Sequence, residues 1–262
     1  GLFSVAADKQ GYFSQGNLQY LARAAGDYAD NTFRFAEHQY DFVGNATATV
    51  GNVYIDDVKS NNAYMGAAYD GWVDLFGYGT SGYYNNQIGY RPWYWTATTA
   101  NYLALHLTGA NANSDWGVYN PIVNGGNRAG EWRTLESSEW TYLLNTRDHA
   151  KRSFATITGV GGNSSNVLGL VILPDEWVLP EGCSYTGDIT ANFTTNTYTA
   201  AQWAMMEENG AVFLPAAGSR SGQGYTAPGT ANATTSANYR SATYNSGNNA
   251  YTLIFYLNAT PT

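Results

Sequence analysis

The sequence predicts an α+β protein of short strands and two or more short helices, and three observations lead to this fold class. The 262 residues include only 12 % charged residues but 15 % aromatic residues and 29 glycines. This composition is poor in the residues of long Lys- and Glu-rich helices and rich in those of strands and turns. Helix patterns are confined to two segments, and no linker-like stretch interrupts the chain. We therefore predict one domain over residues 1–262, long enough to bury a core.

The N-terminal part of the chain has the pattern of short strands. Residues 11–20 alternate apolar and polar side chains around glycine turns, and residues 33–41 continue this alternation. Residues 70–130 are instead rich in Trp, Tyr and Gly, and residues 115–120 are expected to form a buried turn. We expect the loops of this second region to pack through their own aromatic side chains.

Two segments carry helix signals. In residues 132–147, Ser137 is the predicted N-cap and Glu139 lies in the first turn, where the helix dipole favours a carboxylate. The apolar residues that follow share one helix face, at spacings of three and four: Trp140, Leu143 and Leu144. Residues 200–208 form the second predicted helix, which ends before an Asn-Gly pair.

Apolar segments of the C-terminal half predict the core strands. Residues 153–160 and 167–173 are a candidate strand pair. Residues 211–220 contain an apolar segment followed by a tight turn, and residues 250–257 form a further predicted strand.

Between these last two segments lies a polar tract, residues 231–251. Its 21 residues comprise five Asn, five Ala, three Tyr, three Ser and three Thr, with Arg240 and Gly247. Tyr offers a large and rigid contact surface, and Asn and Ser offer adaptable hydrogen bonds, as in binding loops. The tract is therefore either a set of ligand-binding loops or a plain surface loop of small polar residues.

Charge and cysteine content exclude several classes of function. The net charge is -8, with only three lysines, so no basic stripe is present to bind nucleic acid. The longest apolar run, residues 167–173, is too short to span a bilayer, and we expect no membrane insertion. Cys183 is the single cysteine, so no disulfide forms within the chain, and it is expected to be a small buried hydrophobe.

No pattern in the sequence points to catalysis, and we expect neither an enzyme nor a cofactor or metal. His38, His106 and His149 are widely spaced and form no metal-ligand or Ser-His-Asp pattern. The acidic pairs 56–57 and 207–208 are expected to be solvated, because a glycosidase couple depends on spacing in the fold and not on sequence adjacency.

Several motifs in order resemble a known lineage. They are Trp-Arg-x-Leu at 132–135, Glu-Trp at 139–140, a strand ending in Leu-Pro-Asp at 173–175, Gly-Ala-Val-Phe-Leu-Pro-Ala-Ala-Gly-x-Arg at 210–220, and Tyr-Arg-Ser-Ala-Thr at 239–243. This order resembles the C-type-lectin-type fold as elaborated in formylglycine-generating enzymes. Three further motifs resemble exported proteins of gut Bacteroidetes and their phages: Phe-Ser-x-Gly-Asn-Leu-Gln-Tyr at 13–20, Asp-Leu-Phe-Gly-x-Gly-Thr-Ser-Gly at 74–82 and Asp-Trp-Gly-Val-Tyr-Asn at 115–120.

Some proteins of this group are the variable proteins of diversity-generating retroelements. In them, adenines in the codons of a C-terminal tract are randomised, and the tract binds a ligand. Non-variable relatives read Tyr-Trp-Ser-Ser-Thr, from which this chain departs at Arg240 and Ala242 but not at Ser241 and Thr243. The resemblance implies a C-type-lectin-type fold with elaborating insertions, a diversified ligand-binding tract at 231–251, and a place on a cell surface or a phage tail.

The residue types of the tract suggest the binding groups. Tyr supplies aromatic anchors, Arg a planar donor fork and Asn amide donors and acceptors. With Ala242 added from the resemblance, the candidate ligand-binding residues are Asn238, Tyr239, Arg240, Ala242, Tyr244, Asn245, Asn248, Asn249 and Tyr251. The expected ligand is a protein or other cell-surface molecule, and substitutions in the tract are expected to cost little stability.

Three alternatives remain open at this point. The tyrosines of the tract could cap the core while the asparagines only make turns. The chain could be a non-diversified surface adhesin or glycan-binding module of the same fold, although the calcium-dependent sugar-binding motifs of C-type lectins are absent. An enzyme related to formylglycine generation is disfavoured, because those enzymes use cysteines near the C-terminal end and Cys183 is single and upstream.

Overall fold

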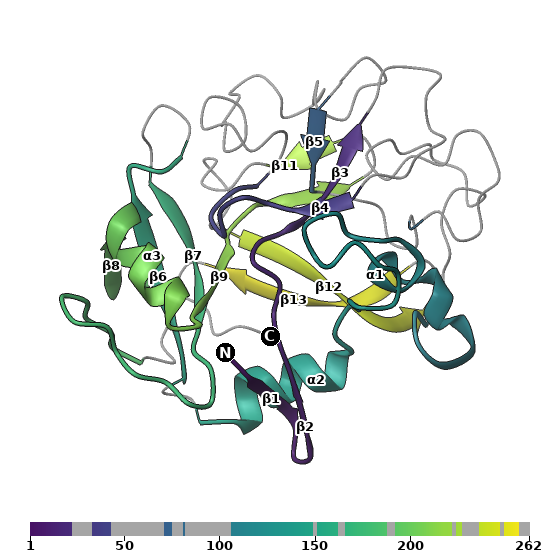
Figure 1. Ribbon diagram of the computed structural model, residues 1–262, viewed down its shortest axis with the longest axis horizontal. Helices are drawn as coiled ribbons and strands as arrows, with labels where there is room; N and C mark the ends of the chain where they lie inside the picture. The colour runs from purple at the N-terminus through teal and green to yellow at the C-terminus, as the bar shows by residue number, and fades with distance from the viewer. Residues whose placement is uncertain are drawn as a thin grey trace.

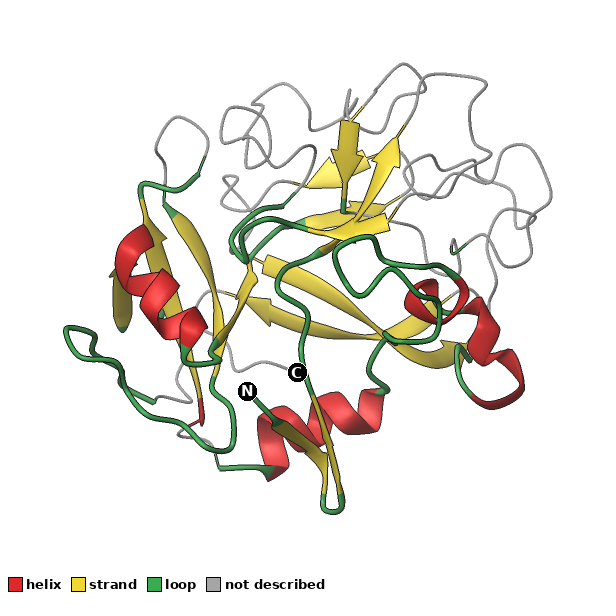
Figure 2. Cartoon of the chain, viewed as in Figure 1, coloured by secondary structure: helices red, strands yellow, loops and turns green. Residues whose placement is uncertain are grey.

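A computed structural model describes residues 1–22, 33–42, 71–74, 81, 106–148, 151–161, 166–187, 192–221, 224–226, 236–246 and 249–256. Within these residues, short strands and short helices are mixed (Figure 1), which confirms the predicted α+β class. Figure 2 shows strands through the middle of the molecule and helices at its edges. Predictions for residues 43–70 and 82–105 lie outside the described residues.

A four-stranded sheet contains the most apolar strands, in the order β8-β6-β7-β9. β6 (Arg152–Thr158) pairs antiparallel with β7 (Val167–Ile172), which confirms the predicted strand pair. β9 (Val212–Pro215) continues the sheet antiparallel to β7. β8 (Asn196–Thr199) lies parallel to β6 at the other edge.

One face of this sheet packs against α3 (Ala200–Glu208), which has the predicted bounds. The hydroxyl of Thr199 accepts a hydrogen bond from the Gln202 N–H (3.2 Å) and so caps the helix N-terminus. Trp203 and Met206 project from α3 into the first core cluster, where they are 1 % and 0 % exposed.

The opposite face packs against α2 (Ser137–Thr141) and the π-helical turn η4 (Tyr142–Thr146) that extends it. Leu143 and Leu144 are buried there, as the helix pattern predicted. Strand residues of the sheet and of the C-terminal hairpin complete this second cluster: Phe154, Leu170, Ile172, Leu214, Leu253 and Phe255. The sheet is therefore covered on both faces.

The predicted N-cap of the first helix is wrong by one residue. Glu136 is the N-cap, and its backbone N–H donates to Oε2 of Glu139 (2.8 Å). Ser137 is instead the first helical residue, and its N–H donates to Oγ1 of Thr243 (3.0 Å). A side chain of the C-terminal hairpin thus satisfies one of the backbone donors at the helix N-terminus.

The polar tract forms a β-hairpin, which corrects the prediction of loops. β12 (Ser236–Ser246) pairs antiparallel with β13 (Asn249–Tyr256), with irregular register around residues 241–243. Residues 231–235 and 247–248 of the tract lie outside the described residues. Three core-facing positions of β12 are small and pack closely: Ala237, Ser241 and Ala242 are at most 1 % exposed.

Shorter strands and helices surround the hairpin. β1 (Phe3–Ala6) pairs with β2 (Lys9–Gly11), and β10 (Ser219–Ser221) pairs with β11 (Gly224–Thr226). A three-stranded sheet has β3 (Leu18–Ala22) between β4 (Phe33–Phe35) and β5 (Gly71–Val73). The remaining helices in the described part of the chain are η3 (Gly109–Ser114) and α1 (Trp116–Tyr119). The predicted buried turn at 115–120 is thus α1, with Trp116 only 6 % exposed. Among the described residues, no helix has the length and apolar character to cross a membrane.

Candidate ligand-binding site

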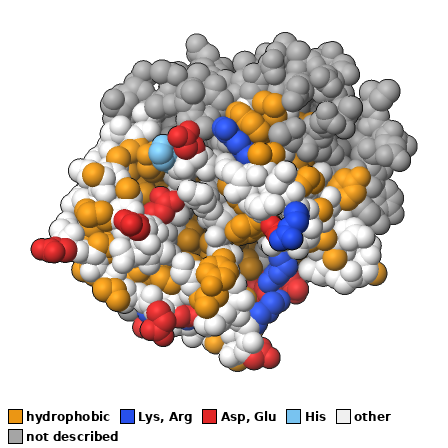
Figure 3. Space-filling view, in the orientation of Figure 1, with side chains coloured by type: hydrophobic (Ala, Val, Ile, Leu, Met, Phe, Trp, Pro, Cys, Tyr) orange, Lys and Arg blue, Asp and Glu red, His pale blue; other side chains and the backbone are white. Residues whose placement is uncertain are grey.

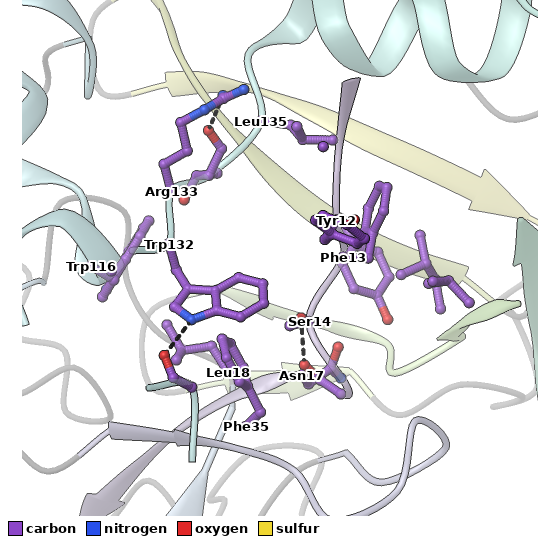
Figure 4. Close-up of a pocket in the computed structure, with 18 of the residues that line it drawn as sticks. Tyr12, Phe13, Ser14, Asn17, Leu18, Phe35, Trp116, Trp132, Arg133 and Leu135 are labelled. Atoms are coloured by element: carbon purple, nitrogen blue, oxygen red, sulfur yellow. Dashed lines mark hydrogen bonds between the residues drawn. The ribbon is translucent and has the colours of Figure 1, made fainter. Parts of the chain in front are cut away.

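A groove with a volume of about 1140 Å³ lies beside the hairpin, and we call it the aromatic groove. Its lining comes from the segment that follows β2, from β4, from α1, from residues 122–135 and from β12. Figure 4 shows Tyr12, Phe13 and Asn17 on one side of the groove, and Trp132 reaching toward Phe35. On the face shown in Figure 3, apolar side chains are exposed beside basic ones.

The floor of the groove is fixed by Trp132. Its indole Nε1–H donates to the Gly125 carbonyl (2.7 Å), and its ring meets Phe35 edge-on at 4.8 Å. Asn124 binds both backbone groups of Phe35, accepting from its N–H (2.7 Å) and donating to its carbonyl (2.9 Å). A Cβ on Gly125 would lie 2.6 Å from the Phe35 ring, so only glycine permits this close approach.

One end of the groove carries a buried ionic network. Arg133 binds the Glu139 carboxylate with both terminal nitrogens (2.6 and 2.7 Å), and Lys9 Nζ lies 2.7 Å from the same group. Burial alone would raise the pKa of Glu139, but hydrogen bonds from Arg133, Lys9 and the Glu136 N–H outweigh it and lower that pKa to about 2. Glu139 therefore stays ionised and fixes this wall.

Asp115 fixes the wall next to it. Its carboxylate is 1 % exposed and accepts hydrogen bonds from the Thr134 N–H (2.6 Å) and hydroxyl (2.8 Å). Burial raises the pKa of Asp115, and the bonds from Thr134 oppose the rise. These contacts join the start of α1 to residues 131–135, so the Asp115 carboxylate is engaged within the groove wall.

Three of the predicted binding residues reach the aromatic groove: Asn238, Tyr239 and Arg240. Arg240 is exposed and Asn238 is half-buried. The Tyr239 side chain is also half-buried, and both its hydroxyl and its ring contact other residues of the protein. The Tyr239 hydroxyl donates to the Pro215 carbonyl (2.9 Å), and its ring stacks on Phe255 at 6.3 Å. Burial, followed by the charge of Asp74, raises the pKa of Tyr239 well above its usual value.

Other predicted residues lie elsewhere on the hairpin. Asn245 and Asn249 are exposed near its turn. The Tyr244 backbone N–H donates to Nδ1 of His106 (3.1 Å), and the two rings meet edge-on at 5.8 Å. Tyr251 is 48 % exposed and borders a separate small cavity of about 90 Å³ beside α2. The predicted residues that the structure describes are therefore spread along the hairpin and do not form a single pocket.

Ala242 is a correction to the predicted site. It is 0 % exposed and packs in a third core cluster with Tyr20, Phe33 and Trp116. Its N–H donates to the Leu135 carbonyl (2.8 Å) and its carbonyl accepts from the Leu107 N–H (2.9 Å). The methyl group of Ala242 therefore faces the core and not a ligand. Asn248 lies outside the described residues.

Sequence reasoning missed the groove residues that lie outside the tract. Tyr12 is 69 % exposed at the groove, and Phe13, Trp116 and Trp132 line it. They belong to three segments that only the tertiary fold brings together. The motifs at 13–20, 115–120 and 132–135 contain Phe13, Trp116 and Trp132, but nothing in the sequence indicates that these residues line one groove.

The described residues hold no cluster of three His, Cys, Asp or Glu side chains placed to bind a metal. His38 is exposed and stacks on Tyr40 at 4.9 Å, and His149 and the acidic pair 56–57 lie outside the described residues. Burial raises the pKa of the Cys183 thiol, which disfavours the nucleophilic thiolate.

Protein-family models, curated proteins and solved structures were each compared with the chain, and none of them matches. The fold and the site by themselves define an α+β protein in which a hairpin presents polar side chains beside an aromatic groove.

Proposed function

We propose that this protein is a non-enzymatic recognition protein that binds a protein or other cell-surface ligand through the hairpin β12–β13. One observation carries the proposal, namely that the hairpin separates anchoring from displayed positions. The anchoring residues are small or apolar and at most 8 % exposed: Ala237, Ser241, Ala242, Ala250, Leu253 and Phe255. The exposed residues are Arg240, Asn245, Ser246, Asn249 and Tyr251, which include the side-chain types of interface hot spots and adaptable paratopes.

The proposal includes a diversified surface of the retroelement type on a single C-type-lectin-type domain with insertions. Support comes from contacts between the motifs that carry the resemblance. Thr243 accepts the Ser137 N–H across 106 residues of sequence, and the Ser241 hydroxyl accepts the Thr243 N–H (3.2 Å). The two positions that agree with non-variable relatives thus have structural roles. Arg240, which departs from them, is exposed.

A location on a cell surface or a phage tail belongs to the same proposal, since a diversified surface acts where it meets foreign molecules. The absence of catalysis is also part of it. It is supported by two buried carboxylates, because Asp115, which lines the groove, is bound by Thr134, and Glu139, which lies behind the groove wall, is bound by Arg133 and Lys9.

A glycan-binding module is the second candidate function, and the aromatic groove is the observation that favours it. An open groove of about 1140 Å³ presents the exposed ring of Tyr12 beside polar groups such as Asn17 and Asn238. Aromatic faces and a few oriented polar groups are what small-molecule and sugar sites require.

Binding to a glycan array and to an array of bacterial surface proteins separates the two functions. Under the hairpin proposal, Arg240→Ala and Tyr251→Ala each weaken capture of the protein partner about tenfold, the effect of a loss of ~1.4 kcal/mol. Tyr12→Ala, which alters the groove outside the hairpin, is the matched control and leaves capture unchanged. Glycan binding that only Tyr12→Ala abolishes would replace the first candidate by the second.

A further inference from the structure

Arg152, the first residue of β6, is a buried cation without a hydrogen bond at two of its nitrogens. The residue is 3 % exposed, yet Nε and Nη1 of its guanidinium are buried and have no acceptor. Arginine keeps its charge inside proteins, and buried charges are almost always paired. An orphaned buried guanidinium therefore calls for a specific explanation.

Two further donors without acceptors accompany it. The hydroxyl of Tyr185 is buried and unbonded, and so is Nε of Arg147. Arg152 pairs with Ile172 at the end of β7, and Arg147 donates to the next carbonyl, that of Leu173, so both arginines lie at this end of β7. Tyr185 interacts electrostatically with both of them. Arg147 uses its other nitrogens on Asp175 (3.0 Å) and on the Leu173 carbonyl (2.9 Å).

Among the residues that the structure describes, the carboxylates nearby leave the charge of Arg152 unbalanced. Oδ1 of Asp175 already accepts a hydrogen bond from Arg147, and Oδ2 accepts hydrogen bonds from Ser4 and Gln10 (both 2.8 Å). Asp148 is exposed and acts on Arg147 and Tyr185. Lys151 adds a further positive charge, and its Nζ donates to the Asp175 carbonyl (2.6 Å). Within the described residues, Tyr185 is the ionisable group that acts on Arg152.

We propose that Arg152, Tyr185 and Arg147 hold a small anion, either an oxoanion or a halide, between β6 and the segment that follows β7. A guanidinium can only donate hydrogen bonds, so the missing partner must be an acceptor. A water molecule would accept the bonds but leave the buried charge uncompensated, whereas an anion satisfies both requirements. None of these three side chains lines the aromatic groove, so the anion site is independent of the proposed recognition function.

Melting temperature measured with different sodium salts at equal ionic strength tests the site. Chloride, sulfate and phosphate are compared with gluconate, which is too bulky for a buried site. The wild-type protein should gain several degrees, in a saturable way, with at least one small anion. Arg152→Met should lose this gain, whereas Arg128→Met should keep it, because the Arg128 side chain is 79 % exposed. The two variants also correct for general salt effects.

Arg152→Met should also differ from the wild type when no small anion is present. In gluconate, Arg152→Met should melt at or above the temperature of the wild type, because it removes an uncompensated buried charge. Equal destabilisation of Arg152→Met in every salt would show that the arginine only packs, and would overturn the proposal. If Arg152→Met does not fold, Tyr185→Phe removes one donor and should weaken the anion response several-fold while the fold is kept.

Crystals soaked in bromide give a direct reading of the same site. An anomalous peak within hydrogen-bond distance of the Arg152 guanidinium is the expected result. Density there without an anomalous signal in any halide, together with no small-anion gain in melting temperature, would mean an ordered water and would contradict the anion site.

Discussion

The four-stranded sheet and the C-terminal hairpin are stabilised by different kinds of residue. The sheet buries aliphatic and aromatic side chains on both faces, against α3 on one side and α2 with η4 on the other. The hairpin is anchored mainly by Ala, Ser and two large apolar residues, and most of its other positions are polar or Tyr. Both are β-structure, but β12 lacks the apolar runs by which the strands of the sheet are recognised.

This difference separates stability from display. Because small residues let β12 approach the core closely, the hairpin is held without large apolar side chains at most positions. Its exposed side chains then carry little of the folding free energy and are available for contact with a ligand. The central strand β6 has no such set of positions, since its residues 152–157 are all buried.

The largest expected effect lies in the sheet layer. Trp203 is 1 % exposed, and its ring packs near Tyr198 (5.7 Å) and Phe213 (5.3 Å). Trp203→Ala should lower the free energy of unfolding by about 3–5 kcal/mol in urea denaturation. Val178→Ala is the control, because Val178 is 73 % exposed and should change it by less than ~0.5 kcal/mol. A loss below ~1 kcal/mol for Trp203→Ala would contradict the claim that buried residues of the sheet layer carry most of the stability.

Tyr239 and Arg240 are neighbours on β12 that should differ in how much they contribute to stability. Tyr239→Ala removes a ring stacked on Phe255 and a hydrogen bond to Pro215, and should cost about 2–3 kcal/mol of stability. Arg240→Ala should cost less than ~0.5 kcal/mol. The expectation of little stability cost throughout the tract is thereby revised for Tyr239. Equal melting temperatures of the two variants would show that Tyr239 is also a display position.

Glu139 tests the wall that joins α2 to the groove. Glu139→Gln should cost about 2 kcal/mol at neutral pH, because it removes the charge that Arg133 and Lys9 surround. Since folding lowers the pKa of Glu139 from 4.5 to about 2, this stability is present above about pH 4.5 and is lost as the pH falls toward 2. In denaturation curves measured across pH, the free energy of unfolding of Glu139→Gln should fall less than that of the wild type between about pH 4.5 and pH 2. Glu131→Gln serves as the exposed control, and an equal effect there would contradict the role of burial.

The smallest effect distinguishes buried from exposed positions of β12. Ala242→Leu should destabilise the protein by about 1–2 kcal/mol, because Ala242 is 0 % exposed and its site has no room for a larger side chain. Asn245→Leu, the same substituent at an exposed position, should change stability by less than ~0.5 kcal/mol. Thermal melting of both variants suffices, and tolerance of Ala242→Leu would restore this residue to the displayed set.

The sequence predicted the elements whose local signals and tertiary contacts agree. α3 has its predicted bounds because Thr199 and Gln202 cap it locally. The first strand of the hairpin, β12, was mistaken for loops because its fully buried positions are Ala and Ser, which give no apolar alternation. The second strand, β13, was predicted at 250–257. The Ser137 cap failed because the Glu139 carboxylate binds the N–H of Glu136, which makes Glu136 the N-cap.

The candidate site was predictable only in part, for a similar reason. Residue types singled out the polar hairpin, and its exposed members Arg240, Asn245, Asn249 and Tyr251 are accessible as a binding surface requires. The aromatic groove has no local signature. Tyr12 and Trp132 lie far apart in the chain, and the fold alone places them on one groove.

Deep sequencing of the gene in its natural population, codon by codon from residue 236 to residue 256, tests the central claim most directly. The account predicts variation at adenine-bearing codons of the exposed positions, above all Arg240, Asn245, Asn249 and Tyr251. It predicts that the anchoring positions Ala237, Ser241, Ala242, Ala250, Leu253 and Phe255 stay fixed. Uniformly low variation, or variation that falls equally on anchoring and exposed positions, would contradict a diversified recognition surface on this hairpin.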